Sequence, residues 1–166
     1  MELSNEDLDE FEIVNFFDTA DYQEYWIEQI GRSDWAASKF LVELLKENRF
    51  FEVLGEDSKL FLLTDGESLI SFCTLSAKDD IPDTELSPWI GFVYTKEQYR
   101  NNGCMKKLIT FVEAEAKKQG IKKIYISTNL EGFYEKLGYK FTSTAKDING
   151  EDSRIYCKKI GGFLFF

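Results

Sequence analysis

The chain has 166 residues, of which 43% are hydrophobic and 16% are aromatic. This length and apolar content predict one globular domain over residues 1–166, with enough apolar mass to build its own core. Histidine is absent, which excludes Ser-His-Asp and Cys-His catalytic sites and two-histidine zinc motifs. Any acid–base chemistry must therefore use Asp, Glu, Tyr, Lys, Cys or water.

The cysteine pattern and the N-terminus indicate the expected compartment. Cys73, Cys104 and Cys157 are an odd number with no close pair, so their spacing fits neither a disulfide framework nor a zinc site. Residues 1–12 are acidic, and no apolar run reaches the ~18 residues that a membrane span needs. We therefore expect a soluble, cytoplasmic protein with no membrane segment and no metal.

Charge is distributed unevenly along the chain. The formal net charge is −10, which argues against a nucleic-acid partner. Residues 1–90 carry −16, whereas residues 91–166 carry +6. A basic C-terminal half suits a small polyanion and an acidic N-terminal half suits a cation, although two solvated surfaces would give the same segregation.

The first half of the chain predicts two helices among short strands. Apolar side chains at helical spacing predict a helix over residues 21–30, ended by Gly31, and a second over residues 35–48 with Asp34 as its N-cap. Strands are predicted over residues 11–16, 60–64 and 69–77. The dipeptide Asp65-Gly66 favours a tight hairpin turn between the last two strands.

The middle of the chain predicts a buried strand followed by a long helix. Residues 88–95 form an apolar run too continuous for a strand with one buried face, which places this strand in the centre of a sheet. Thr95 and Gln98 have the spacing of a capping box and predict one short turn. A helix with one apolar face and one lysine-rich face is predicted over residues 103–119, ended by Gly120.

The last part of the chain predicts three more strands and one short helix. The strands are predicted over residues 123–127, 139–144 and 154–159, with Asn149-Gly150 between the last two as a hairpin signal. Thr128 and Glu131 form a second capping box, which predicts a short helix through Leu137 that Gly138 ends. The order β-α-α-β-β-β-α-β-α-β-β predicts a mixed sheet with helices on its faces.

The junction between the central strand and the long helix predicts an anion-binding site. A helix start leaves backbone N–H groups without partners and carries a partial positive charge, so a phosphate group can bind there. Gly103 permits close approach to this helix start, and Arg100, Lys106 and Lys107 add positive charge. A glycine near a helix start is common, so a simple turn is the alternative interpretation.

Two segments resemble the GNAT superfamily of N-acetyltransferases. Residues 94–103 (YTKEQYRNNG) resemble its Gln/Arg-x-x-Gly-x-Gly/Ala signature at the start of the long helix, and residues 129–139 (NLEGFYEKLGY) resemble its Asn-x-x-Ala-x-x-Phe-Tyr-x-x-x-Gly-Phe region. The order of elements over residues 11–159 agrees. The resemblance implies an α/β fold with a central mixed, mostly antiparallel sheet of about six or seven strands and about four helices.

The resemblance also implies acetyl-CoA as the acetyl donor. The pantetheine arm would lie along the central strand and the pyrophosphate would bind backbone N–H groups of residues 101–106, which agrees with the chemistry of a helix start. The implied cofactor-binding residues are Val93, Tyr94, Thr95, Arg100, Asn101, Asn102, Gly103, Cys104, Met105, Lys106 and Asn129. Asn129 could instead cap a helix beside Thr128. Met105 departs from the small residue of the signature, and its side chain is expected to weaken pyrophosphate binding.

Tyr134 corresponds to the general acid that protonates the departing thiolate of CoA, and a core tyrosine beside Phe133 is the alternative. Its hydroxyl has a reference pKa of ~10, against ~8.5 for a thiol. In the family, transfer from CoA to the amine is direct, so the cysteines are expected to be packing residues. Some relatives carry a general-base Glu on the central strand, where this chain has Trp89.

An acceptor amine is charged in water and must lose a proton before it attacks a thioester. Glu85 is the predicted general base, because it shares strand parity with Trp89 if the strand extends that far, and Asp83 is the second choice. The acids of this loop could also be only solvated. Three early aromatic residues, Tyr22, Trp26 and Trp35, could line an acceptor pocket or belong to the core.

The sequence therefore predicts an N-acetyltransferase that moves an acetyl group from acetyl-CoA directly to a primary amine of a small molecule or peptide. The acidic N-terminal half favours a polycationic acceptor such as a polyamine or an aminoglycoside. The alternatives are a non-catalytic acyl-CoA-binding or regulatory domain and a protein or peptide N-acetyltransferase. The apolar tail, residues 161–166, is expected to pack in the fold or in a homodimer.

Overall fold

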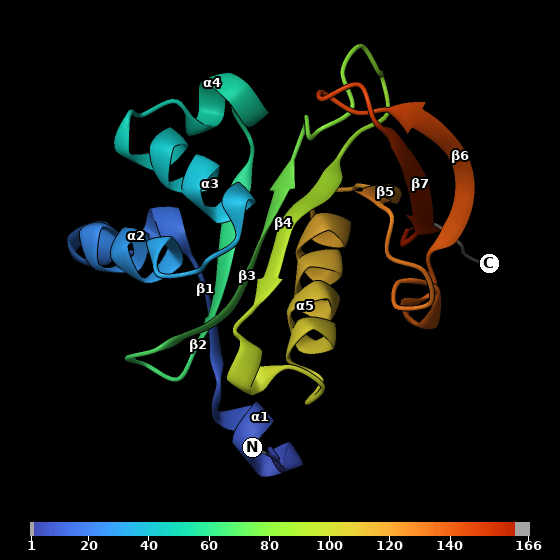
Figure 1. Cartoon of the computed structure of the whole chain (residues 1–166). Helices are drawn as coiled ribbons and strands as arrows, with labels where there is room; N and C mark the ends of the chain where they lie inside the picture. Colours follow the sequence, from blue (N-terminus) through green and yellow to red (C-terminus); the bar gives the residue numbers. More distant parts are fainter. Residues whose placement is uncertain (1, 162–166) are drawn as a thin grey trace.

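Residues 2–161, the part of the chain that the computed structural model describes, form a seven-stranded mixed sheet with helices on both faces (Figure 1). The strands are β1 (Glu12–Asn15), β2 (Lys59–Thr64), β3 (Leu69–Ser76), β4 (Trp89–Thr95), β5 (Lys123–Thr128), β6 (Lys140–Lys146) and β7 (Asp152–Lys159). Their order is β1-β2-β3-β4-β5-β7-β6, and only β4 and β5 pair in parallel. The predicted mostly antiparallel α/β fold is confirmed.

Within the same range the helices are α1 (Asn5–Glu10), α2 (Gln23–Gly31), α3 (Ala36–Lys46), α4 (Phe50–Leu54) and α5 (Cys104–Lys118). Short 3₁₀ helices occur at Phe16–Asp18, Ala20–Tyr22, Glu97–Tyr99 and Glu135–Leu137. Figure 1 shows α2, α3 and α4 on one face of the sheet and α5 on the other. The sequence missed α1 and α4, because a helix of five or six residues is too short to show a helical period.

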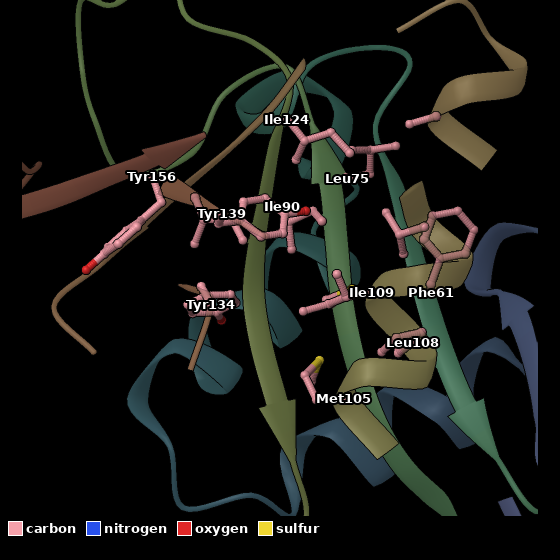
Figure 2. Packing of buried hydrophobic residues seen from close by; sticks show 14 residues of the cluster. Phe61, Leu75, Ile90, Met105, Leu108, Ile109, Ile124, Tyr134, Tyr139 and Tyr156 are labelled. Atoms are coloured by element: carbon pink, nitrogen blue, oxygen red, sulfur yellow. The ribbon is translucent and has the colours of Figure 1, made fainter. Parts of the chain in front are cut away.

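The apolar faces of the helices build a core on each side of the sheet. Leu108, Ile109 and Val112 of α5 are fully buried and pack on the strands on one side, as Figure 2 shows for the first two. Leu41 and Leu44 of α3 are fully buried on the other side. Burial of such a side chain stabilises the fold by about 1.5–3 kcal/mol. These two cores hold β4 in the middle of the sheet.

A β-bulge interrupts β4 near its middle. Phe92 and Val93 together lie opposite Cys73 of β3, so β4 contains one extra residue at this point. Phe92 has φ 48°, a left-handed conformation that residues other than glycine rarely adopt. A bulge bends its strand and increases the local twist, so the second half of β4 changes direction.

The bulge accompanies a separation of β4 from β5. Within the described residues the two strands pair only at Trp89 and Tyr125, whereas β5 and β7 pair along their whole length. Figure 1 accordingly shows the unit of β5, β7 and β6 turned away from strands β1 to β4. The second half of β4 therefore presents an unpaired edge toward β5.

Three capping predictions are wrong. Trp35, not Asp34, is the N-cap of α3, and the turn before it is held by the Ser33 hydroxyl, which accepts the Trp35 N–H at 3.0 Å. The short helix after β4 forms without a side-chain cap, because the Thr95 hydroxyl lies 2.9 Å from that of Ser71. The Thr128 hydroxyl accepts the N–H of residue 130, and only the 3₁₀ turn Glu135–Leu137 follows in place of the predicted helix.

Two further predictions concern membrane-spanning helices and the C-terminal tail. No helix within the described range is long and apolar enough to cross a membrane. Of the apolar tail, residues 162–166 lie outside the described residues, so its packing in the fold or in a homodimer stays a prediction.

A buried polar contact ties α5 to the turned-away strands. The Tyr139 hydroxyl donates to Glu113 of α5 at 2.7 Å, and the Lys158 ammonium of β7 lies 3.0 Å from the same carboxylate. Tyr139 is 1% exposed, so its hydroxyl depends on this single acceptor. Burial and the Glu113 charge raise the pKa of Tyr139, which keeps the hydroxyl protonated as the donor.

We predict that Glu113→Ala lowers the free energy of unfolding by about 2–4 kcal/mol, because it leaves a buried hydroxyl without an acceptor and a half-buried ammonium without its counter-charge. Urea denaturation measures the change. Glu115→Ala is the matched control on the same helix; its partner Lys118 is exposed, so the expected loss is about 0.5 kcal/mol or less. Equal losses in the two variants would contradict the role assigned to Glu113.

Candidate functional site

A cavity of about 970 Å³ opens beside the second half of β4. Four segments form its wall: the turn between α2 and α3, the end of β4, the turn into α5, and the connection from β5 to β6. The lining residues are Arg32, Ser33, Asp34, Trp35, Val93, Tyr94, Thr95, Lys96, Glu97, Gln98, Tyr99, Arg100, Asn101, Gly103, Cys104, Met105, Lys106, Thr128, Leu130, Phe133 and Tyr134. Nine of the eleven predicted cofactor-binding residues and Tyr134 are among them.

The unpaired edge of β4 forms one wall of this cavity. Toward β3, Tyr94 and Thr95 are in register with Phe72 and Ser71, so that side of β4 is hydrogen-bonded. Toward β5 no strand pairing continues beyond Trp89 in the described part of the chain. The Tyr94 carbonyl accepts from the Ser71 hydroxyl and the Thr95 carbonyl accepts from Arg100. The other backbone groups of residues 93–95 that point toward β5 can pair with an amide-containing ligand that lies along the strand.

The start of α5 adds a second set of free donors. Gly103 is the N-cap in the left-handed conformation, with φ 81°, and no side chain caps the helix. The first backbone N–H of α5 that bonds within the helix is that of Lys107, which donates to the Gly103 carbonyl at 3.0 Å. The three preceding N–H groups remain available to an anion, and the helix dipole favours negative charge there.

Basic side chains surround the same end of the cavity. Arg100 donates from Nε to the Thr95 carbonyl at 2.8 Å and lies 5.5 Å from the centre of the Tyr94 ring, so its charge is held beside β4. Burial and the nearby Arg32 lower the pKa of Lys96. With Lys106 these groups give this end of the cavity the positive potential that a polyanion requires.

Two predicted cofactor-binding residues do not line the cavity. The Asn102 side chain accepts the Leu3 N–H at 2.9 Å and donates to the Arg100 carbonyl at 2.8 Å, so it braces the turn before α5. The Asn129 side chain donates to the Asp152 carbonyl at 3.0 Å and accepts the Arg154 N–H at 3.2 Å. Asn129 therefore joins the end of β5 to β7, a role that only the tertiary pairing of these strands creates.

Met105 does not obstruct the helix start as the sequence suggested. Its side chain is 8% exposed and packs in the core cluster under α5, beside Ile109 (Figure 2). Because side chains on a helix diverge from the axis, the backbone N–H of this residue stays at the helix end while the thioether points into the core. The expected weakening of an anion site by this side chain therefore lacks a structural basis.

Tyr134 lies in the wall of the same cavity. It is 4% exposed and packs edge-to-face on Phe133, with ring centres 4.9 Å apart. Burial raises the pKa of Tyr134, and the nearby Cys73 and Asp79 add to the effect. Its hydroxyl forms no hydrogen bond within the described residues, so the O–H can donate to a ligand.

The predicted general base lies elsewhere. β4 begins at Trp89, so Glu85 belongs to the loop before the strand, is exposed, and does not line the cavity. The strand parity that favoured Glu85 is therefore wrong, because Pro88 cannot donate to a sheet ladder. Asp83 is also exposed. Asp79, which the sequence marked only as part of an acidic loop, lies against Gly91 of β4.

The aromatic side chains proposed for an acceptor pocket separate into three environments. Trp35 lines the cavity and stacks on Tyr94, with ring centres 5.6 Å apart. Trp26 is buried in the core on the α2 and α3 face, and Tyr22 is 66% exposed away from this cavity. The contribution of Arg32 and Asp34 had no sequence signal, because a helix-helix turn meets β4 only in the folded chain.

No group of three or more Cys, Asp or Glu side chains within residues 2–161 is arranged to hold a metal ion. The cavity instead combines a free strand edge, a helix start with basic neighbours, and a buried phenol with a free hydroxyl. These features fit an elongated ligand with amide groups in its middle and a polyanionic end.

Comparison with known proteins shows which protein family this chain is similar to. The family model of the acetyltransferase (GNAT) family matches residues 8–139. The aminoglycoside 6'-N-acetyltransferase of Enterococcus faecium has a TM-score of 0.68 at 17% identity, over 93% of this chain and 99% of that chain. An aminoglycoside 6'-N-acetyltransferase complexed with coenzyme A has a TM-score of 0.61 at 16% identity, over 93% and 99%.

A third structure is the acetyltransferase of Salmonella typhimurium that modifies the N-terminal serine of a 50S ribosomal subunit protein. It has a TM-score of 0.62 at 11% identity, over 91% of this chain and 95% of that chain. At such identities these structures establish the fold alone. No curated protein sequence matches this chain.

We predict that Met105→Ala lowers the free energy of unfolding by about 2–3 kcal/mol, because it leaves a cavity in the core under α5. Denaturant unfolding monitored by circular dichroism measures the loss. Lys106→Ala, at the next and exposed position of the same helix turn, is the control and should change the free energy by less than about 0.5 kcal/mol. A loss below that size for Met105→Ala would show that the thioether is not a core side chain.

Proposed function

We propose, because this chain belongs to the GNAT acetyltransferase family, that it moves an acetyl group from acetyl-CoA directly to the primary amine of a small molecule or peptide. The observation that carries this proposal is that one cavity is lined by the uncapped start of α5, the unpaired edge of β4 and Tyr134. We further infer that residues 1–166 act as one acetyltransferase domain.

The chemistry of the cavity fits the parts of acetyl-CoA. The free N–H groups at the start of α5, with Arg100 and Lys106 beside them, would bind the pyrophosphate. The pantetheine arm carries amide groups, which would pair with the free edge of residues 93–95 as an added strand would. The thioester would then lie toward the bulge at Phe92, on the side where Tyr134 meets the cavity.

Tyr134 would act as the general acid. Its raised pKa keeps the hydroxyl protonated at neutral pH, as a proton donor requires. The same burial makes the phenol a weaker acid, and it would also raise the proton affinity of a thiolate that leaves in apolar surroundings, as burial raises the pKa of the neighbouring Cys73 thiol. The two effects act in opposite directions on proton transfer from the phenol to sulfur.

A cationic amine is the proposed acceptor class. Residues 1–90 carry a net charge of −16, and the loop that precedes β4 contributes four of these acids: Asp79, Asp80, Asp83 and Glu85. Negative charge on the approach to a site concentrates cationic substrates. Two of the similar structures are aminoglycoside 6'-N-acetyltransferases, which supports a polyamine or an aminoglycoside as the acceptor. A peptide N-terminus is the second candidate, because a third structure modifies an N-terminal serine.

The first prediction on function concerns ligand binding and acceptor preference. Acetyl-CoA at ~100 times Kd should stabilise the protein by about 2.7 kcal/mol and raise the melting temperature by several degrees. Release of the CoA thiol, measured with a chromogenic disulfide, should be faster with spermidine or kanamycin than with glycinamide or glutamate. A short peptide with an N-terminal serine tests the second candidate.

Adenosine diphosphate is the control ligand, because it has the pyrophosphate but not the pantetheine arm, and it should raise the melting temperature less. Faster acetylation of the neutral or acidic amines would reject the cationic acceptor. Stabilisation by acetyl-CoA with no thiol release from any amine would instead favour a non-catalytic acyl-CoA-binding domain.

The second prediction concerns the general acid. Tyr134→Phe should lower kcat by about 10²-fold, because the leaving sulfur loses its proton donor, while acetyl-CoA raises the melting temperature as in the unchanged protein. Tyr125→Phe is the control, since Tyr125 is a partly buried tyrosine of β5 outside the cavity wall. Equal turnover by Tyr134→Phe and the unchanged enzyme would show that Tyr134 is only a packing residue.

A further inference from the structure

The proposed transfer requires a group that removes a proton from the acceptor ammonium, and no carboxylate belongs to the residues of β4. The structure brings one to the strand from the loop before it. An ideal Cβ atom built on Gly91 would lie 2.0 Å from Asp79 Oδ1. The carboxylate of Asp79 therefore occupies the space where the side chain of residue 91 would be. It lies against β4 in the place that a carboxylate carried by the strand itself would take.

This position adjoins the reacting end of the cavity. Gly91 precedes the bulge at Phe92 and lies two residues from Val93, the first residue of β4 in the cavity wall. Two residues span at most about 7 Å along a strand. Asp79 is also close enough to Tyr134 for its charge to act on that hydroxyl. The Asp79 carboxylate and the Tyr134 hydroxyl thus lie near the same part of β4, where this strand separates from β5.

Two buried polar atoms at this point have no hydrogen-bond partner among the described residues. One is the Thr74 hydroxyl oxygen, on the residue of β3 that is in register with Gly91, and the other is Asp80 Oδ1, next to Asp79. Thr74 is completely buried. Buried polar atoms in folded proteins are nearly always paired, so two unpaired atoms beside one carboxylate are expected where a ligand with N–H donors completes the bonding.

We propose that Asp79 is the general base of the transfer and receives the proton of the acceptor ammonium. The inference rests on the proposed acetyl transfer and names the residue that this function lacks. Neither Glu85, the carboxylate that sequence parity favoured, nor Asp79 belongs to the wall of the cavity. Asp79 differs from Glu85 because it lies against β4 in the space left by the absent side chain of Gly91.

For an acceptor amine R–NH₃⁺, the protons and electrons of the transfer balance. One proton passes from nitrogen to the Asp79 carboxylate, and the nitrogen lone pair forms the C–N bond to the acetyl carbon. The C–S bond breaks with its electron pair on sulfur, and the Tyr134 hydroxyl gives sulfur a proton. The second proton lost by nitrogen returns to Tyr134 through solvent, and Asp79 releases its proton to solvent. The products are the amide, the CoA thiol and one proton.

The surroundings of Asp79 suit this task. Burial and the adjacent Asp80 charge raise the pKa of Asp79 to about 7, close to neutral pH, where a base both holds and releases a proton readily. The charged and titratable groups that act on it are Asp80 of the same loop and Tyr134 near the same part of β4. Because the carboxylate form is the base, kcat/KM should rise with pH through about 7.

The test compares Asp79→Asn with the unchanged enzyme in the full chain, with spermidine and with kanamycin as acceptors. We expect kcat/KM to fall by about 10²-fold or more and its rise near pH 7 to disappear, while acetyl-CoA still raises the melting temperature. Asp57→Asn, which removes an exposed acid outside the cavity wall, should change kcat/KM by less than threefold. Glu85→Gln, which removes the competing loop carboxylate, should lower kcat/KM by much less than Asp79→Asn does.

Gly91→Ala provides an independent variant that keeps the carboxylate. Residue 91 does not have a positive φ, so alanine fits its backbone, but the new methyl group would overlap Asp79 Oδ1 and displace it from the strand. We expect a loss of kcat/KM in the same direction, and no further loss when Gly91→Ala is added to Asp79→Asn. Additive losses would show that Gly91 acts independently of Asp79 and would count against the proposal.

A readout without turnover uses stability. The folded protein holds the Asp79 proton more tightly than the unfolded chain, where Asp has a pKa of ~3.9, so the stability from this group is fully present below pH ~3.9 and is lost as pH rises from there to about 7. Asp79→Asn should therefore raise the melting temperature more at pH 8 than at pH 5. No difference between the two pH values would overturn the assigned environment of Asp79.

The outcomes separate this inference from the proposed function. An unchanged enzyme that releases no CoA thiol with any amine rejects the transfer itself. An active enzyme whose Asp79→Asn variant keeps kcat/KM within threefold rejects Asp79 alone, and a large loss in Glu85→Gln would assign the role to Glu85.

Discussion

The architecture of the candidate site depends on one constraint, which is that β4 and β5 share a single pair of residues before they separate. A parallel neighbour would ordinarily satisfy the backbone groups of a central strand, and here the bulge at Phe92 turns β4 away from it. The unpaired edge is tolerated because the cores on both faces hold β4 in place. Backbone N–H and C=O groups of β4 therefore stay unpaired in the centre of the sheet, where a ligand can bind them.

The charge around the cavity is uneven for structural reasons. The start of α5 combines the free N–H groups after Gly103 with basic side chains from three segments of the chain. The acidic loop that begins at Asp79 lies outside the wall of the cavity and reaches β4 at Gly91. Positive potential in the wall favours the polyanionic part of an elongated ligand, and the acids of the loop favour a cationic partner.

The sequence predicted the major elements well, because long amphipathic helices and buried strands leave periodic signals. It was less accurate where one residue has two possible partners. Asn129 has the motif position of a ligand-contacting residue, yet both of its polar groups bond to β7. Met105 breaks a small-residue pattern, but its thioether packs in the core rather than at the helix start. Neither outcome could be read from the chain, because both depend on the direction of a side chain in the folded molecule.

The sequence by itself determined the order of elements, the mixed sheet, the glycine-capped start of α5 and the family, since each rests on local periodicity, capping chemistry or a short motif. The tertiary structure alone decided which side chains line the cavity beside β4 and which carboxylate lies against that strand. Asp79 and Gly91 lie twelve residues apart, and their relation exists only because a loop returns its carboxylate to a strand position without a side chain. Contacts of this kind arise from packing across the fold, and no local pattern in a sequence records them.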